Sequence, residues 1–218
     1  MIRNEFKTKI IFNFVKKLPY FTINDIYPVE KNKTYLIVFL SRYTKSGKII
    51  RLKKGVYTTK EYIEEIQKKD IYPYYLEFIS NILYSPSYLS LEYVLSEYNI
   101  ITEFSSNFTL ITTNKTNYFS NKLGSFFYHT IKKELFSGFN IKKEGNFTIL
   151  KASKPKALFD FLYFRKNFLH DIETVEELRL NLNNITKKDI KELEKFVNLE
   201  GSKKMRNILT LILKLWKH

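Results

Sequence analysis

Apolar residues recur at helical spacing near the N-terminus, at strand-like spacing in the middle of the chain, and at helical spacing again toward its C-terminus. Between residues 2 and 18 they fall in two neighbouring rows, namely Ile2, Phe6, Ile10 and Phe14, and Ile11, Val15 and Leu18. This periodicity predicts a helix. Pro19 ends it, because the residue before a proline disfavours the helical conformation.

Two further helices are expected before residue 46. Thr22 is a good N-cap for a short helix over residues 23–27, which Pro28 stops. Gly47 marks the end of a third helix, since glycine is the favoured residue just past a helix. This helix is expected over residues 33–43, where one face carries Leu36, Leu40 and Tyr43, with Tyr35 and Phe39 beside it.

A hairpin of two strands is expected directly after the third helix. Two β-prone runs, residues 48–52 and 56–59, are separated by Lys53-Lys54-Gly55. A glycine-containing turn between such runs is typical of a hairpin. Three helices followed by a hairpin is the element order of a winged helix-turn-helix, whose third helix enters the DNA major groove. The sequence therefore predicts a winged helix-turn-helix over residues 1–60.

The remainder, residues 61–218, is predicted to be a mixed domain. Helices around residues 73–83 and after Ser90 precede candidate strands at 108–112, 117–121, 126–131, 139–142 and 147–150. Helices are expected again after Ser153 and over residues 175–182, 187–197 and 203–216. The predicted fold class is α+β, with a winged helix-turn-helix followed by a mixed domain that ends in helices. The domain boundary is expected near residues 60–70.

Charge is distributed unevenly along the chain. The 218 residues include 37 Lys and Arg against 22 Asp and Glu, a formal net charge of +15. Residues 1–60 carry +11, residues 61–152 carry −1, and residues 153–218 carry +5. An AT-rich genome would enrich lysine evenly, so codon supply explains part of the total but not its distribution. The basic first segment favours a polyanionic partner, nucleic acid above all.

Candidate DNA-binding residues follow from the predicted elements. The hairpin concentrates cations with almost nothing acidic nearby, as the neutralisation of phosphates requires. On the third helix, Ser41 and Arg42 can reach base edges, and arginine is the commonest reader of guanine in the major groove. The full candidate set is Lys33, Ser41, Arg42, Lys45, Lys48, Arg51, Lys53 and Lys54. The competing interpretation is a helical domain whose basic face is merely solvated.

No catalytic, metal or cofactor site is expected. The chain has no cysteine, which removes disulfides, thiolate metal ligands and cysteine nucleophiles together. Asp160 lies in an aromatic stretch and is expected to cap, to pair with a nearby Lys or Arg, or to face solvent. No phosphate-binding glycine loop is complete. No metal-binding spacing occurs at His129, His170 or His218. The sequence therefore does not predict an enzyme.

The hydrophobic runs are too short for a membrane span. The longest uncharged run is the fourteen residues between Glu77 and Glu92, whereas a spanning helix needs roughly 20 apolar residues. The chain is therefore expected in the cytoplasm.

Three stretches resemble the antitoxins of AbiE-type abortive-infection systems, the antitoxin halves of type IV toxin–antitoxin pairs. The first, Leu40 to Tyr57, combines a recognition helix, a pair ending in glycine, two apolar residues with arginine, and a basic turn before Gly-Val-Tyr. The second is Pro86 to Ile101. The third, Ala152 to Tyr163, contains a Pro-x-Lys-Ala-Leu-x-Asp pattern. They lie in the expected order and span about residues 20–165.

The resemblance implies a winged domain that binds double-stranded DNA at the promoter of its own operon and represses it. Gly55 becomes a backbone requirement of the wing turn. The C-terminal part is implied to counter a cognate nucleotidyltransferase toxin, which a type IV antitoxin need not touch. The implied DNA contacts are Arg42, Lys45, Lys48, Arg51, Lys53 and Lys54. Two alternatives stay open: a plain winged-helix regulator, and a basic protein-interaction module.

Overall fold

The computed structural model describes residues 2–102 and 107–216. The chain groups into two compact units: unit 1 runs to Leu83 and includes Phe119–Gly124, and unit 2 holds the remainder. The boundary predicted near residues 60–70 falls inside unit 1. The reason is local, since the side chain of Thr59 ends the hairpin and at once caps the next helix, accepting a 3.1 Å bond from the Tyr62 amide.

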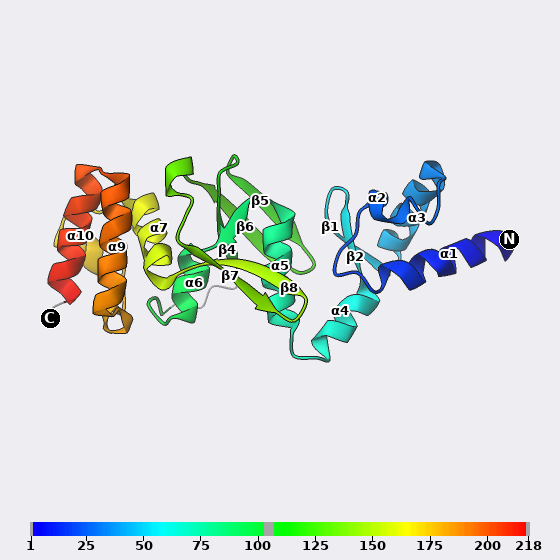
Figure 1. The fold of residues 1–218 in the computed structure, drawn as a ribbon, viewed down its shortest axis with the longest axis horizontal. Coiled ribbons are helices and arrows are strands. Elements are labelled where there is room, and N and C mark those ends of the chain that lie inside the picture. Colours follow the sequence, from blue (N-terminus) through cyan, green and yellow to red (C-terminus); the bar gives the residue numbers. More distant parts are fainter. Residues whose placement is uncertain (1, 103–106, 217–218) are drawn as a thin grey trace. The chain divides into compact units, whose positions relative to one another are not determined.

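Unit 1 begins with three helices and a hairpin, in the predicted order and within a few residues of the predicted ends (Figure 1). Two more helices complete it. The elements are α1 (Ile2–Val15), α2 (Ile23–Ile26), α3 (Lys33–Lys45), β1 (Ile49–Lys53), β2 (Val56–Thr59), α4 (Lys60–Gln67) and α5 (Tyr72–Leu83).

The core of unit 1 forms where the three helices meet. Its buried members include Ile11, Val15, Phe21, Ile26, Leu36, Phe39, Leu40 and Ile49. The half-buried ring of Phe12 packs 5.2 Å from Phe39, so α1 buries the row that contains Ile11 and Val15. The neighbouring row predicted from the sequence faces outward instead, with Phe6 65%, Ile10 41% and Phe14 40% exposed. The two-row pattern predicts a helix, but it does not predict which row packs into the core.

The hairpin is held to the helices by backbone hydrogen bonds. Strands β1 and β2 are antiparallel, with Arg51 opposite Tyr57. The Phe21 amide donates to the Tyr57 carbonyl at 2.7 Å, and the Tyr57 amide donates back to Phe21 at 2.9 Å. The turn needs glycine, because Gly55 has φ +82°. The position of the hairpin beside the helices is therefore fixed by the segment between α1 and α2.

Helix α5 contacts the segment after α1 and the second strand of the hairpin, in the same unit. Tyr75 is fully buried, and its hydroxyl donates to the Pro19 carbonyl at 2.8 Å and lies 3.1 Å from the Thr58 hydroxyl. Burial is the main cause that raises the pKa of Tyr75 far above its ordinary value.

The remaining elements form a six-stranded sheet and the helices and turns packed around it. They are β3 (Ser87–Leu89), α6 (Leu91–Glu97), β4 (Phe108–Thr112), β5 (Asn117–Asn121), β6 (Gly124–Thr130), the 3₁₀ turn η1 (Lys133–Leu135), β7 (Phe139–Glu144), β8 (Phe147–Ala152), α7 (Lys154–Arg165), α8 (Ile172–Glu176), the 3₁₀ turn η2 (Leu182–Asn184), α9 (Lys187–Glu200) and α10 (Lys203–Trp216).

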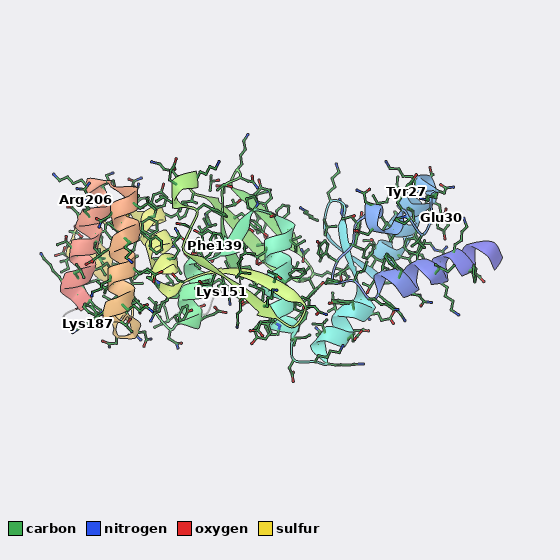
Figure 2. The ribbon with its side chains drawn as sticks, in the orientation of Figure 1. Tyr27, Glu30, Phe139, Lys151, Lys187 and Arg206 are labelled. Atoms are coloured by element: carbon green, nitrogen blue, oxygen red, sulfur yellow. The ribbon has the colours of Figure 1, made fainter. Side chains whose placement is uncertain are left out.

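The sheet has the order β5-β6-β4-β3-β8-β7. All five predicted strands are present, but the sequence missed β3, which pairs antiparallel with β4 and parallel with β8. Its three residues are too few to show a period, although all three are buried. Lys151 of β8, labelled in Figure 2, donates to both carboxylate oxygens of Glu97 at 2.9 and 3.0 Å and so ties the sheet to α6.

The chain ends in helices, as predicted. Helices α9 and α10 lie side by side (Figure 1), and α10 buries Met205, Ile208 and Ile212. The helix predicted at residues 175–182 is wrong: α8 begins after the cap residue Asp171 and ends at Glu176. The backbone then leaves the helical region, with Arg179 at φ +49°. The fold is mixed α+β, with a helical N-terminal region followed by sheets and C-terminal helices.

A buried ion pair lies at the start of α7. Lys156 Nζ lies 2.7 Å from Asp160 Oδ1, and both side chains are fully buried. Tyr88 and Ser90 donate to Asp160 Oδ2 at 3.0 and 2.7 Å, and Lys156 also donates to the Leu135 carbonyl at 2.8 Å. Ser90 occupies the N-cap position of α6, but its side chain makes no capping hydrogen bond and its hydroxyl donates to Asp160. Of the three roles considered for Asp160, pairing with a lysine is the one observed.

Candidate nucleic-acid interface

A groove between α3 and the hairpin brings together four of the eight residues predicted to bind DNA. We call it the α3–hairpin groove; its lining includes Ile37, Ser41, Lys45, Arg51 and Lys54. Ser41 and Lys45 are one helical turn apart on α3, so they face the same side. Arg51 comes from β1 and Lys54 from the turn, and all four predicted residues are exposed.

Local structure sets the position of each cation in this groove. Lys45 lies in the last turn of α3, where a positive charge also complements the helix dipole. The Arg51 Nε donates to the Lys53 carbonyl at 3.4 Å, which holds the guanidinium stem along the hairpin. Lys54 stands beside Gly55 at the exposed tip. Three cations from three separate elements therefore converge on one concave surface.

Arg42 lies on an adjacent face of α3. It lines a second groove, with Glu5 and Lys9 of α1 and with Val38 and Tyr43 of α3. Its guanidinium carbon lies 5.5 Å from the centroid of the Tyr43 ring, which provides a flat surface beside it. The arginine is exposed and close in sequence to Ser41, so the two predicted base-reading residues occupy adjacent faces of one helix.

Two further predicted residues lie away from the α3–hairpin groove. Lys33 starts α3, so it is about 18 Å along the helix axis from Lys45 at 1.5 Å per residue. Lys48 lines a third groove that also contains Glu61 and Glu64 of α4. The carboxylates beside Lys48 reduce the positive potential there, so this lysine is a weaker candidate for phosphate contact than Lys45 or Lys54.

Lys53 is engaged within the protein. Its ammonium donates a 2.7 Å hydrogen bond to the Leu83 carbonyl and lies 6.0 Å from the Phe119 ring centroid. Burial lowers the pKa of Lys53 below its ordinary value. The neighbouring carbonyl of Leu52 accepts from the Asn121 amide at 2.9 Å. Lys53 is the last residue of β1 and Lys54 lies in the turn, so the two lysines have different surroundings, which a count of cations could not show.

Among the described residues, none of those that line the α3–hairpin groove is acidic. No Asp or Glu occurs between Lys31 and Lys60. The flanking carboxylates pair with lysines of the first helical segment: Glu30, labelled in Figure 2, lies 2.5 Å from Lys7, and Glu61 lies 3.2 Å from Lys16. Attraction of this surface to a polyanion is therefore not cancelled locally.

The sequence analysis missed two exposed apolar residues on α3. Ile37 is 54% and Val38 is 59% exposed, on the face between the two grooves that hold Lys45 and Arg42. The signal was available: both positions lie off the Leu36, Leu40 and Tyr43 face that the helical period assigns to the core.

Histidines do not assemble a metal site in the described residues. His129 is half-buried, 5.4 Å from the Phe164 ring, and burial is the main cause that lowers its pKa. His170 is exposed, with Nε2 3.2 Å from Asp171 Oδ2. His218 lies outside the described residues. Within residues 2–102 and 107–216, no group of three potential metal ligands occurs.

A search of the described helices for one long and apolar enough to cross a membrane finds none.

Comparison with known proteins leaves these observations to stand by themselves. No protein-family model matches the chain, and no curated protein matches it in sequence.

Proposed function

We propose that this chain is a DNA-binding antitoxin that represses its own toxin–antitoxin operon in the cytoplasm. The observation that carries the DNA-binding part is the α3–hairpin groove, where Lys45, Arg51 and Lys54 converge from three elements and no acidic residue intervenes. In the proposal, α1 to α3 and the hairpin act as a winged helix-turn-helix, with α3 in the major groove and the hairpin on the phosphates.

The proposed contacts divide into positioning and reading. Lys45, Arg51 and Lys54 neutralise phosphates, which supplies salt-dependent affinity without sequence information. Ser41 and Arg42 read base edges, with Arg42 suited to a bidentate contact with guanine. Lys33 and Lys48 contribute long-range attraction. Lys53 is set apart from the predicted set, because its ammonium is already bound to the Leu83 carbonyl.

The antitoxin part of the proposal rests on the resemblance of three stretches to AbiE-type antitoxins. The third stretch supplies the buried ion pair of unit 2, Lys156 and Asp160, and the second supplies Tyr88 and Ser90, whose hydroxyls donate to Asp160. The resemblance thus coincides with residues that hold unit 2 together. In the proposal, unit 2 serves the action against a cognate nucleotidyltransferase toxin, with or without direct contact.

A gel-shift series with the DNA upstream of the gene tests the DNA-binding part. The full-length protein is expected to shift this fragment in the presence of excess unrelated duplex. Arg42→Ala is expected to reduce the ratio of specific to unspecific affinity, and Arg42→Lys to retain unspecific affinity while relaxing the sequence preference. Equal affinity of the wild type for upstream and unrelated DNA would contradict a sequence-specific repressor.

Co-expression tests the antitoxin part separately. If a nucleotidyltransferase gene adjoins this one, its expression is expected to arrest growth, and this chain is expected to relieve the arrest. Relief by the wild type together with weaker relief by Asp160→Ala, which removes the counter-charge of the buried Lys156, supports the role. A plain transcriptional regulator would bind upstream DNA yet leave the arrest unchanged.

A further inference from the structure

We infer that α3 reads thymine methyl groups through Ile37 and Val38, so that the chain prefers a site with thymines at the centre of its contact with the major groove. The inference rests on the proposed DNA binding and extends it to the class of base that is recognised. The observation behind it is the pair of adjacent, more than half-exposed β-branched residues in the middle of the proposed recognition helix.

These side chains have no role in the core of unit 1. The buried face of α3 is formed by Leu36, Phe39 and Leu40, and the helix ends are capped by Asn32 and Ser46. Ile37 and Val38 project from the opposite side, where their apolar surface meets solvent. Exposed apolar residues that serve no packing purpose are a common mark of a binding surface.

The charged residues beside Ile37 and Val38 indicate which kind of partner this surface binds. Ile37 shares its groove with Lys45, Arg51 and Lys54. Val38 shares its groove with two cations, Lys9 and Arg42, and one carboxylate, Glu5. An apolar protein partner would have to leave these cations without counter-charges, or to supply several carboxylates at once. A DNA duplex supplies phosphates for the flanking cations and, in the floor of the major groove, the C5-methyl group of thymine for the apolar centre.

The shape of the side chains suits such reading. Isoleucine and valine on a helix are nearly confined to one χ1 rotamer, so the positions of their methyl groups are set before binding and little entropy is lost. Ser41, one turn after Ile37, can accept or donate a hydrogen bond at a neighbouring base. The expected site therefore has thymines flanked by a base pair that Arg42 reads.

Replacement of thymine by deoxyuridine tests the inference directly, because it removes the methyl group alone. The probe is the duplex that the full-length protein enriches from a random library, prepared with thymine or with deoxyuridine. The wild type is expected to bind the deoxyuridine duplex about fourfold more weakly for each methyl group contacted, since burial of one such group is worth about 0.8 kcal/mol.

The double variant Ile37→Ala/Val38→Ala completes the cycle. It is expected to bind both duplexes with similar affinity, at the level of the wild type on the deoxyuridine duplex, with an unchanged dependence on salt. Leu199→Ala, which truncates a 55%-exposed apolar residue of α9, is the matched control and is expected to retain the full preference for thymine.

Two failures can be told apart. If the wild type shows no salt-dependent binding to either duplex, the proposed function itself fails. If it binds both duplexes equally and with normal salt dependence, DNA binding stands and the reading of thymine is overturned. The inference is also overturned if the double variant changes the molar mass in solution while keeping the thymine preference, because α3 would then form a contact between copies.

Discussion

The ammonium of Lys53 donates a 2.7 Å hydrogen bond to the Leu83 carbonyl, while the next residue, Lys54, is exposed and lines the α3–hairpin groove. The two adjacent lysines therefore differ in what their ammonium groups can bind. One satisfies a backbone acceptor at the end of α5, and the other is available to a phosphate. This contrast provides a matched pair of variants within a single turn.

Alanine is expected to weaken DNA binding at one of these positions and folding stability at the other. Lys54→Ala should weaken DNA binding and lower the slope of log affinity against log salt by about 0.9, the value for one lost phosphate contact. Lys53→Ala should leave that slope near the wild-type value and reduce the free energy of unfolding by about 1 kcal/mol, because the Leu83 carbonyl loses its partner. Fluorescence anisotropy and urea titration measure the two quantities. The opposite assignment of effects would contradict the structure of the turn.

The conformation of Gly55 leads to a second prediction. At φ +82° a side chain strains the backbone, although no atom lies within 4 Å of the position a Cβ would take. Gly55→Ala should therefore cost about 1 kcal/mol of unfolding free energy through the backbone alone. Gly55→Asn should cost less, since asparagine tolerates this region better. Equal destabilisation by the two variants in urea titrations would point to a steric cause that the structure does not show.

The buried pair of Lys156 and Asp160 leads to a third prediction. Asp160→Ala leaves an ammonium buried without its counter-charge and should reduce the free energy of unfolding by about 3–5 kcal/mol. The double variant Lys156→Met/Asp160→Leu removes both charges and should be markedly more stable than Asp160→Ala alone. Urea unfolding measures both. A double variant no more stable than Asp160→Ala would show that the buried ammonium without its counter-charge is not the cause of the loss.

Asp189 provides a prediction about pH. Burial opposes its ionisation, but hydrogen bonds from Lys154 and from the Thr186 backbone and hydroxyl outweigh burial and hold the pKa of Asp189 below its ordinary value. Because the unfolded chain then binds the proton more readily than the folded one, the stabilisation is complete above the unfolded pKa of about 3.9 and is lost as the pH falls through the folded pKa.

The variant Asp189→Asn should therefore be less stable than the wild type by about 1 kcal/mol at pH 7, through loss of part of the cap and of the Lys154 contact. The difference should shrink steadily below about pH 4. Glu194→Gln on the same helix serves as the control, because it removes one negative charge and leaves the cap intact. A difference that stays constant down to pH 3 would argue against a depressed pKa.

Much of the fold was predictable because its local signals are strong. Helix α10 lies at the predicted residues, since its apolar period is unbroken, and the hairpin is fixed by β-prone runs around a glycine turn. The prediction failed where local signals are weak or shared. Strand β3 is too short to show a period, and the end of α8 depends on Arg179 entering a left-handed conformation. Such features are decided by the surrounding structure.

The candidate interface was predictable in composition but not in arrangement. A run of cations between Lys45 and Lys54 marks the surface, yet the sequence does not tell which ammonium finds an internal acceptor. Lys53 does so through Leu83, thirty residues away along the chain. The exposure of Ile37 and Val38 was predictable, because both positions lie off the Leu36, Leu40 and Tyr43 face that the helical period assigns to the core.

The salt dependence of DNA binding tests whether DNA lies on the α3–hairpin groove. A triple variant, Lys45→Ala/Arg51→Ala/Lys54→Ala, is compared with Lys188→Ala/Lys191→Ala/Lys195→Ala, which removes the same charge from exposed positions of α9. The groove variant is expected to lower the slope of log affinity against log salt by about 2.7, because each of three lost phosphate contacts contributes about 0.9. The α9 variant is expected to leave the slope unchanged. Equal effects of the two triple variants would contradict a DNA interface at the α3–hairpin groove.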